Sequence, residues 1–199
     1  MTNVGGAPPP PEVGTRLTWY RLTDPLFKEI DTAGTKAPLL LVNVPPMEEW
    51  TPEATWPDGC TLFIAFQDPE NVGAMIRSAA AFGVKRAVLL REAAHPFHPK
   101  SLRAAGPAVF QVQLMQGPSI KDLASGDVPL IALDGEGADL SSEPFPERFG
   151  LVPGVEGPGL PEHLRRGHSR RIPIEAGVES LNAATATAIA LYAWRRGQG

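Results

Sequence analysis

A predicted helix in the middle of the chain combines an amide and a guanidinium side chain. Asn71 stands at the expected helix start, and Arg77 follows about one and a half turns later. An asparagine at such a position can cap the helix or hold a phosphate or ribose oxygen, and the free N–H groups of a first turn favour an anion. Arg77 adds a planar donor fork that is always charged. The pattern indicates either an oxygen-binding site or an ordinary capped helix with a surface arginine.

A glycine-rich segment surrounds one carboxylate further along the chain. Residues 151–160 contain three glycines and two prolines around Glu156, directly after a predicted strand. Glycine lets a backbone approach a ligand closely, and open α/β sheets bind ligands at the ends of their strands. The spacing matches neither the dinucleotide fingerprint nor the phosphate loop. Taken alone, the segment is either a ligand loop or a tight turn.

Small polar side chains mark the start of the last predicted helix. Ser180 and Asn182 come where the apolar periodicity of residues 181–196 begins. Either side chain is suited to cap the helix or to bind a ligand. Because capping requires only one of them, the pair favours a binding role for the other.

The elements that must position these residues alternate between β-type runs and helices. Such alternation predicts one α/β domain with an open parallel sheet flanked by helices. We expect helices at 72–82 and 181–196 and strands at 61–66, 87–90, 130–133, 149–152 and 171–174.

The N-terminal part of the chain has a different composition. Residues 1–14 are rich in Gly and Pro, which predicts a disordered tail. Residues 15–59 contain one convincing element, a buried strand at 38–44, and form a small arm or lobe in our interpretation. We therefore expect the main domain to span residues 60–199.

Composition limits the class of protein. The 199 residues include 43% hydrophobic residues, enough for one core, and neither a signal peptide nor a membrane-spanning run is evident, so we expect a cytoplasmic protein. The single cysteine, Cys60, is expected to be structural. No metal-ligand pattern is evident in the histidines, which we expect on the surface: His95, His98, His163 and His168.

The charge distribution bears on nucleic-acid binding. A net charge of −4 is unusual for a protein that binds phosphate backbones. Residues 1–59 hold four basic and eight acidic residues, so much of the acidic excess lies there. Arginines gather in two groups that form either positive patches or a solvated surface: Arg165, Arg166, Arg170 and Arg171, and then Arg195 and Arg196.

Together and in this order, the three segments resemble the signature motifs of the SpoU/TrmH family of SPOUT-class RNA methyltransferases. The resemblance covers residues 60–196. The matching motifs are Asn71-x-Gly73-x-x-x-Arg77-x-Ala79 with Phe82-Gly83, Gly154-x-Glu156-Gly157-x-Gly159-Leu160, and Ile172-Pro173-Ile174 with Glu179-Ser180-Leu181-Asn182.

The resemblance implies transfer of a methyl group from S-adenosylmethionine to a ribose 2′-hydroxyl of tRNA or rRNA. It implies a deep C-terminal trefoil knot that holds the cofactor, a homodimer that shares its active site, and chemistry that needs no metal because the methyl is already activated as a sulfonium. The matched catalytic residues are Arg77, Asn71, Glu156, Ser180 and Asn182. The matched cofactor-binding residues are Leu133, Val152, Gly154, Ile172, Ile174 and Leu181.

The chain departs from the family pattern at one loop. The family commonly has Arg-x-Ser-x-Gly-Ala where this chain has Arg103-Ala-Ala-Gly-Pro-Ala108, so RNA contacts of that loop are not carried over. Two alternatives stay open. One is a non-catalytic module that binds RNA or cofactor on the same fold, and the other is a SPOUT enzyme that methylates a base nitrogen.

Overall fold

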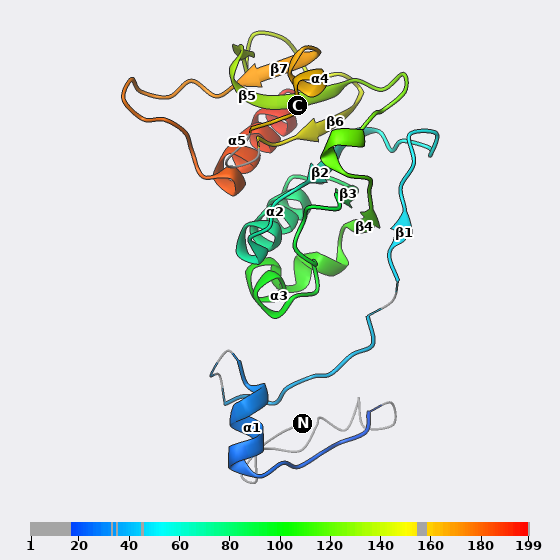
Figure 1. Ribbon diagram of the computed structural model, residues 1–199, viewed down its shortest axis with the longest axis vertical. Helices are drawn as coiled ribbons and strands as arrows, with labels where there is room; N and C mark the ends of the chain where they lie inside the picture. The colour runs from blue at the N-terminus through cyan, green and yellow to red at the C-terminus, as the bar shows by residue number, and fades with distance from the viewer. Residues whose placement is uncertain (1–16, 33, 35, 45, 155–158, 199) are drawn as a thin grey trace. The chain divides into compact units, whose positions relative to one another are not determined.

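The structure is a computed structural model that describes residues 17–32, 34, 36–44, 46–154 and 159–198. The chain divides into two compact units, Met1–Pro45 and Pro46–Gly199 (Figure 1). In the smaller unit the helix α1 (Asp24–Ile30) buries Phe27. The larger unit begins well before residue 60 because Trp50 and Trp56 pack on Phe63, with ring centroids 5.0 and 5.9 Å away.

A parallel sheet forms the centre of the larger unit. Across the described residues its seven strands follow the order β1-β4-β3-β2-β6-β5-β7, and every pair is parallel. The predicted open parallel sheet is thereby confirmed. The strands are β1 (Glu48–Glu49), β2 (Gly59–Ile64), β3 (Arg86–Leu89), β4 (Gln113–Gln116), β5 (Leu130–Asp139), β6 (Arg148–Val152) and β7 (His168–Arg171).

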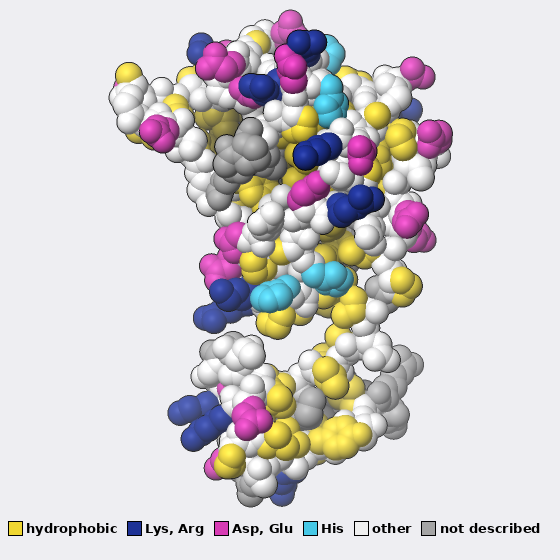
Figure 2. Space-filling view, in the orientation of Figure 1, with side chains coloured by type: hydrophobic (Ala, Val, Ile, Leu, Met, Phe, Trp, Pro, Cys, Tyr) yellow, Lys and Arg dark blue, Asp and Glu magenta, His cyan; other side chains and the backbone are white. Residues whose placement is uncertain are grey.

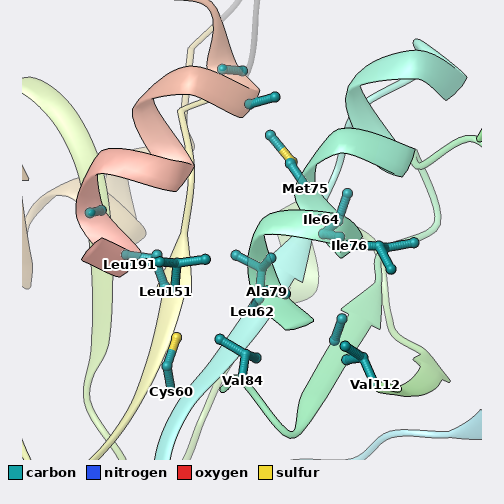
Figure 3. Packing of buried hydrophobic residues seen from close by; sticks show 14 of the residues in the cluster. Cys60, Leu62, Ile64, Met75, Ile76, Ala79, Val84, Val112, Leu151 and Leu191 are labelled. Carbon is teal, nitrogen blue, oxygen red and sulfur yellow. The ribbon is translucent and has the colours of Figure 1, made fainter. Parts of the chain in front are cut away.

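Helices cover the sheet on both faces. They are α2 (Pro69–Ala81), α3 (Pro99–Ala105), η2 (Gly106–Phe110), η3 (Ile120–Asp122), α4 (Glu162–Arg165) and α5 (Ala183–Arg196). Successive side chains of β2 point to opposite faces. Leu62 and Ile64 therefore join the core under α2 and α5, as Figure 3 shows, while Phe63 joins a second core with Leu164 of α4. No helix within the described ranges is long and apolar enough to cross a membrane.

Local signals explain where the two long helices begin. Asp68 caps α2 by accepting the Glu70 N–H at 3.0 Å, and a proline at the first position fits the helix start. Asn71 therefore lies inside the first turn of α2 and does not cap it, although a capping role was one of the two that its position allowed. Asn182 caps α5 by accepting the N–H groups of Ala184 and Thr185.

Two strand predictions were wrong. Residues 38–44 form no strand, and Leu41 is 81% exposed, because an apolar run becomes a strand only where a partner pairs with its backbone. The last strand lies at His168–Arg171 and not at 171–174, since a polar sequence pairs there with β5. Cys60 is buried as expected, and burial raises the pKa of its thiol.

Candidate functional site

A cavity of about 670 Å³ opens at the carboxyl ends of β6 and β7, beside the middle of β5. This volume is typical of sites for small ligands and cofactors. Its lining comes from the middle of β5, the loop after β6, the end of β7 with the segment that follows it, and the start of α5. The described lining residues are Leu133, Asp134, Gly135, Gly154, Gly159, Leu160, Arg170, Arg171, Ile172, Ile174, Glu179, Ser180, Leu181, Asn182, Ala183 and Ala186.

Most of the residues expected at the site meet at this cavity. Five of the six expected cofactor-binding residues line it: Leu133, Gly154, Ile172, Ile174 and Leu181. The sixth, Val152, is fully buried in the core at the end of β6. Ser180 and Asn182 also line the cavity. Glu156 lies outside the described residues.

An irregularity in β5 shapes one wall of the cavity. Both Leu133 and Ala138 pair with Arg170 of β7, so residues 134–137 bulge out of the ladder. Asp134 stabilises the turn within the bulge by accepting a hydrogen bond from the Glu136 N–H at 2.9 Å. A Cβ on Gly137 would lie 2.5 Å from the Ser169 carbonyl carbon, which only glycine avoids. The bulge therefore presents Asp134 to the cavity.

A hydrogen bond between two asparagines joins α2 to α5 at the edge of the site. Asn182 Nδ2 donates to Asn71 Oδ1 at 3.1 Å, while its Oδ1 caps α5. One N–H of Asn182 and the amide N–H groups of Asn71 make no hydrogen bond to the described residues. These donors are therefore available to a ligand oxygen.

Arg77 leaves α2 in a different direction from Asn71. Six positions separate the two residues, which corresponds to about 120° around the helix and about 9 Å along it. Gly73, four positions before Arg77 on the same face, packs on α3, where a Cβ would lie 2.3 Å from the Ser101 carbonyl oxygen. Arg77 is exposed and makes no hydrogen bond or ion pair with any described residue. Within one chain, Arg77 is thus directed toward α3, while Asn71 meets α5.

Arg170 is a buried part of the cavity wall. Its guanidinium donates to the carbonyl oxygens of Glu143 and Pro144 at 2.9 and 3.0 Å and lies 4.5 Å from the Phe145 ring centroid. Burial lowers the pKa of this guanidinium. This buried role could not be predicted, because the arginine cluster that contains Arg170 indicated a positive patch or a solvated surface.

The sequence analysis also missed two carboxylates in the lining, Asp134 and Glu179. Asp134 directly follows the apolar run 130–133, and a polar side chain at a strand end is the signal that could have found it. Together with Arg171 and the apolar Leu133, Leu160 and Leu181, these groups give a cavity of mixed character. It suits a ligand that has a flat apolar part and both signs of charge.

Comparisons with known proteins place this geometry in a family. A model described as the SpoU rRNA Methylase family matches residues 61–192. "Ribosomal RNA small subunit methyltransferase G 2" of Syntrophobacter fumaroxidans is 53% identical over 95% of the chain, but the chain spans only 38% of that relative's length. "23S rRNA (guanosine(2553)-2'-O)-methyltransferase RlmP" of Bacillus subtilis is 31% identical over 92% of the chain and 75% of the relative.

A solved structure agrees with the fold. The SpoU methyltransferase AviRb from Streptomyces viridochromogenes, in complex with the cofactor AdoMet, superposes with a TM-score of 0.64 and is 28% identical. The similarity covers 73% of this chain and 62% of that chain. The match of residues 61–192 spans the three motifs, the sheet from β2 to β7 and most of α5, and the chain belongs to the SpoU rRNA methylase family.

Proposed function

We propose that the protein is an S-adenosylmethionine-dependent RNA methyltransferase that modifies a ribose 2′-hydroxyl of tRNA or rRNA. The observation that carries the proposal is the cavity beside β5 and the ends of β6 and β7, which gathers seven of the residues expected at a cofactor and ribose site. The name of the Bacillus relative specifies a 2′-O-methylated guanosine, and the AviRb complex holds AdoMet. Both support the proposal.

The cavity residues fit the proposed cofactor. Leu133, Leu160 and Leu181 offer an apolar surface for an adenine ring. Carboxylates favour cations nearby, so Asp134 and Glu179 suit the sulfonium and ammonium groups. Arg171 suits a carboxylate. S-adenosylmethionine would supply a methyl group already activated on a sulfonium, and the chain's own residues then position the acceptor.

Arg77 is proposed to orient the RNA and to stabilise negative charge that develops on the 2′-oxygen. A guanidinium pKa of about 12.5–13.8 makes a poor base, so we assign it no proton abstraction. Asn71 and Asn182 hold the ribose through their free amide N–H groups. Glu156 and Ser180 complete the proposed site.

We propose a homodimer in which Arg77 of one protomer serves the cavity of its partner. The divergence of Arg77 from Asn71 supports this arrangement, since one copy directs them to different flanks of α2. The exposed side chains of Ile189 and Tyr192 on α5 suit the interface, where Phe82 already packs on Tyr192 with ring centroids 6.2 Å apart. A trefoil knot around the segment from β7 to α5, which extends from the body in Figure 1, belongs to the same proposal, as does a cytoplasmic location.

Calorimetric titration with S-adenosylmethionine and its demethylated product tests the cofactor first. We expect saturable binding at one site per chain. Incubation with radiolabelled cofactor and total RNA, followed by digestion to nucleosides, then tests the reaction. Label in 2′-O-methylribose supports the proposal, whereas label in a base assigns the protein to the base-methylating alternative. Cofactor binding without any transfer favours the non-catalytic module.

A further inference from the structure

Positive charge is concentrated in one stretch of the larger unit. Residues 71–121 contain seven basic residues and one acidic residue, a formal charge of +6, although the whole chain carries −4. All other residues together therefore carry −10. The stretch forms most of α2 and all of β3, α3, η2 and β4, so the charge is confined to one part of the fold.

Several arginines outside this stretch are paired or buried, whereas Arg171, Arg195 and Arg196 are exposed and form no ion pair with the described residues. Arg148 pairs with Asp58 at 2.8 Å, and Arg166 pairs with Glu162 at 2.6 Å. Arg165 lies 3.9 Å from Asp134. Since Arg170 is buried against backbone carbonyls, Arg171 is the arginine of the cluster around α4 and β7 that keeps an unpaired charge among the described residues, and it lines the cavity.

Three exposed and unpaired cations lie on the neighbouring helices α2 and α3. Arg77, Lys100 and Arg103 are exposed, and no described residue forms an ion pair or hydrogen bond with their side chains. Arg77 shares a face of α2 with Gly73, which contacts α3. Lys100 and Arg103 are three positions apart and share the solvent face of α3. Figure 2 shows Lys or Arg side chains beside two histidines over α2 and α3.

An exposed aromatic ring lies on the element that follows α3. Phe110 is 76% exposed, more than any other large hydrophobic side chain described in the larger unit. η2 runs on directly from α3, and the buried Val109 anchors it to the core that contains Met75 and Ala79 of α2. Phe110 is therefore held in solvent by a fixed backbone, on the element that directly follows the helix of Lys100 and Arg103.

We propose that Lys100, Arg103 and Phe110 form a docking surface for single-stranded RNA, which leads the strand toward Arg77. Cations without carboxylate partners suit phosphates, and an exposed aromatic face on a fixed element suits an unstacked base. The partner is RNA rather than an apolar protein surface because the exposed ring lies on the element that directly continues the helix of two unpaired cations. This inference rests on the proposed function, in which RNA is the substrate.

The phosphate contacts are tested with the full-length protein and a fluorescein-labelled oligouridine, followed by anisotropy at several salt concentrations. The double variant Lys100→Gln/Arg103→Gln is compared with Arg148→Gln/Arg166→Gln, which removes the same charge at paired positions. We expect the first to bind more weakly and to lose about 0.7 per contact from the slope of log K against log salt. The control should keep the wild-type slope. Equal losses in both variants would overturn the proposal.

Stacking is tested by Phe110→Ala, with Phe110→Trp as the conservative variant. We expect alanine to weaken oligouridine binding roughly 5- to 150-fold and tryptophan to restore it. Unchanged binding by Phe110→Ala, or a change in sedimentation that identifies Phe110 as a contact between copies, would overturn the assignment. Calorimetry with S-adenosylmethionine separates the two proposals. If the wild-type protein binds no cofactor, the proposed function is wrong. If cofactor binding is normal and RNA affinity is unaltered in all variants, only the docking surface is wrong.

Discussion

Asn182 serves two helices at once, since its oxygen caps α5 and its amide nitrogen donates to Asn71 on α2. We expect Asn182→Ala to lower the free energy of unfolding by about 1–2 kcal/mol, because the cap and the link are both lost. Asn71→Ala removes the link alone and should cost about half as much. Urea unfolding measures both, and calorimetry with S-adenosylmethionine should show weaker binding for Asn182→Ala. Equal unfolding free energies for the two variants would contradict the capping role.

At the scale of residues, sequence analysis predicted the site residues whose type and position indicate their role. Ser180 and Asn182 stood at a helix start, and Leu133 at a strand end, and all three line the cavity. Arg170 could not be predicted, because its burial depends on the carbonyl groups of residues 143 and 144, far away in the chain. Helical geometry alone separates Arg77 from Asn71, although their shared helix suggested one common target.

At the scale of elements, α2 and α3 approach each other closely at Gly73. A Cβ there would lie 2.3 Å from the Ser101 carbonyl oxygen and 2.7 Å from the Ala104 Cβ, and a backbone atom cannot swing away. We expect Gly73→Ala to lower the free energy of unfolding by about 1–3 kcal/mol through overpacking, despite the better helix propensity of alanine.

The matched control for this substitution is Gly197→Ala. At Gly197 the nearest atoms to a new Cβ lie at 3.5 and 3.7 Å, an ordinary contact, and its backbone is right-handed. Urea unfolding of this variant should match the wild type or exceed it slightly. Equal destabilisation by both substitutions would contradict the packing argument.

Glu92 connects the segment after β3 to η3 through hydrogen bonds. Its ionisation therefore makes the stability of the fold depend on pH. Partial burial raises the pKa of its carboxyl, but hydrogen bonds from Ser119 Oγ at 2.5 Å and from the Ile120 N–H outweigh that effect and lower it overall. A folded-state pKa below the unfolded value of about 4.3 stabilises the fold above that pH, and this stability is lost as pH falls through the folded pKa. The midpoint of thermal unfolding should therefore fall more steeply below about pH 4.3 in the wild type than in Glu92→Gln. Unfolding midpoints of the wild type and Glu92→Gln that fall in parallel with pH would contradict the stabilising role of the Glu92 carboxylate.

The elements that the sequence predicted well are those with their own hydrophobic period. β2, β3 and β6 coincide closely with apolar runs, β5 begins at its apolar run but continues to Asp139, and α5 ends at Arg196 as predicted. β1 and β7 consist of polar residues, so their identity as strands depends on the neighbour that pairs with them. The opposite holds for residues 38–44, which are apolar but form no strand in the described structure.

At the scale of the whole molecule, the boundary of the larger unit makes a prediction about truncation. A chain that begins at Pro46 keeps Trp50 and Trp56, whose rings pack on each other and on Phe63. We expect it to unfold cooperatively, with a midpoint within about 3 °C of the full-length chain. A chain that begins at Cys60 loses both rings, and its midpoint should fall by more than about 10 °C. Thermal unfolding followed by circular dichroism compares them, and equal midpoints would contradict the boundary at Pro46.

Cys60 is the only cysteine in the chain, and it lies 1% exposed in the middle of the sheet. Because the thiolate is the reactive form and burial raises the pKa of this thiol, alkylation has to wait until β2 is released from its neighbours. The rate at which a thiol reagent modifies Cys60 in the folded protein, without denaturant, therefore reports how often the centre of the sheet opens. Alkylation of Cys60 thus measures the frequency of rare opening events without any engineered label.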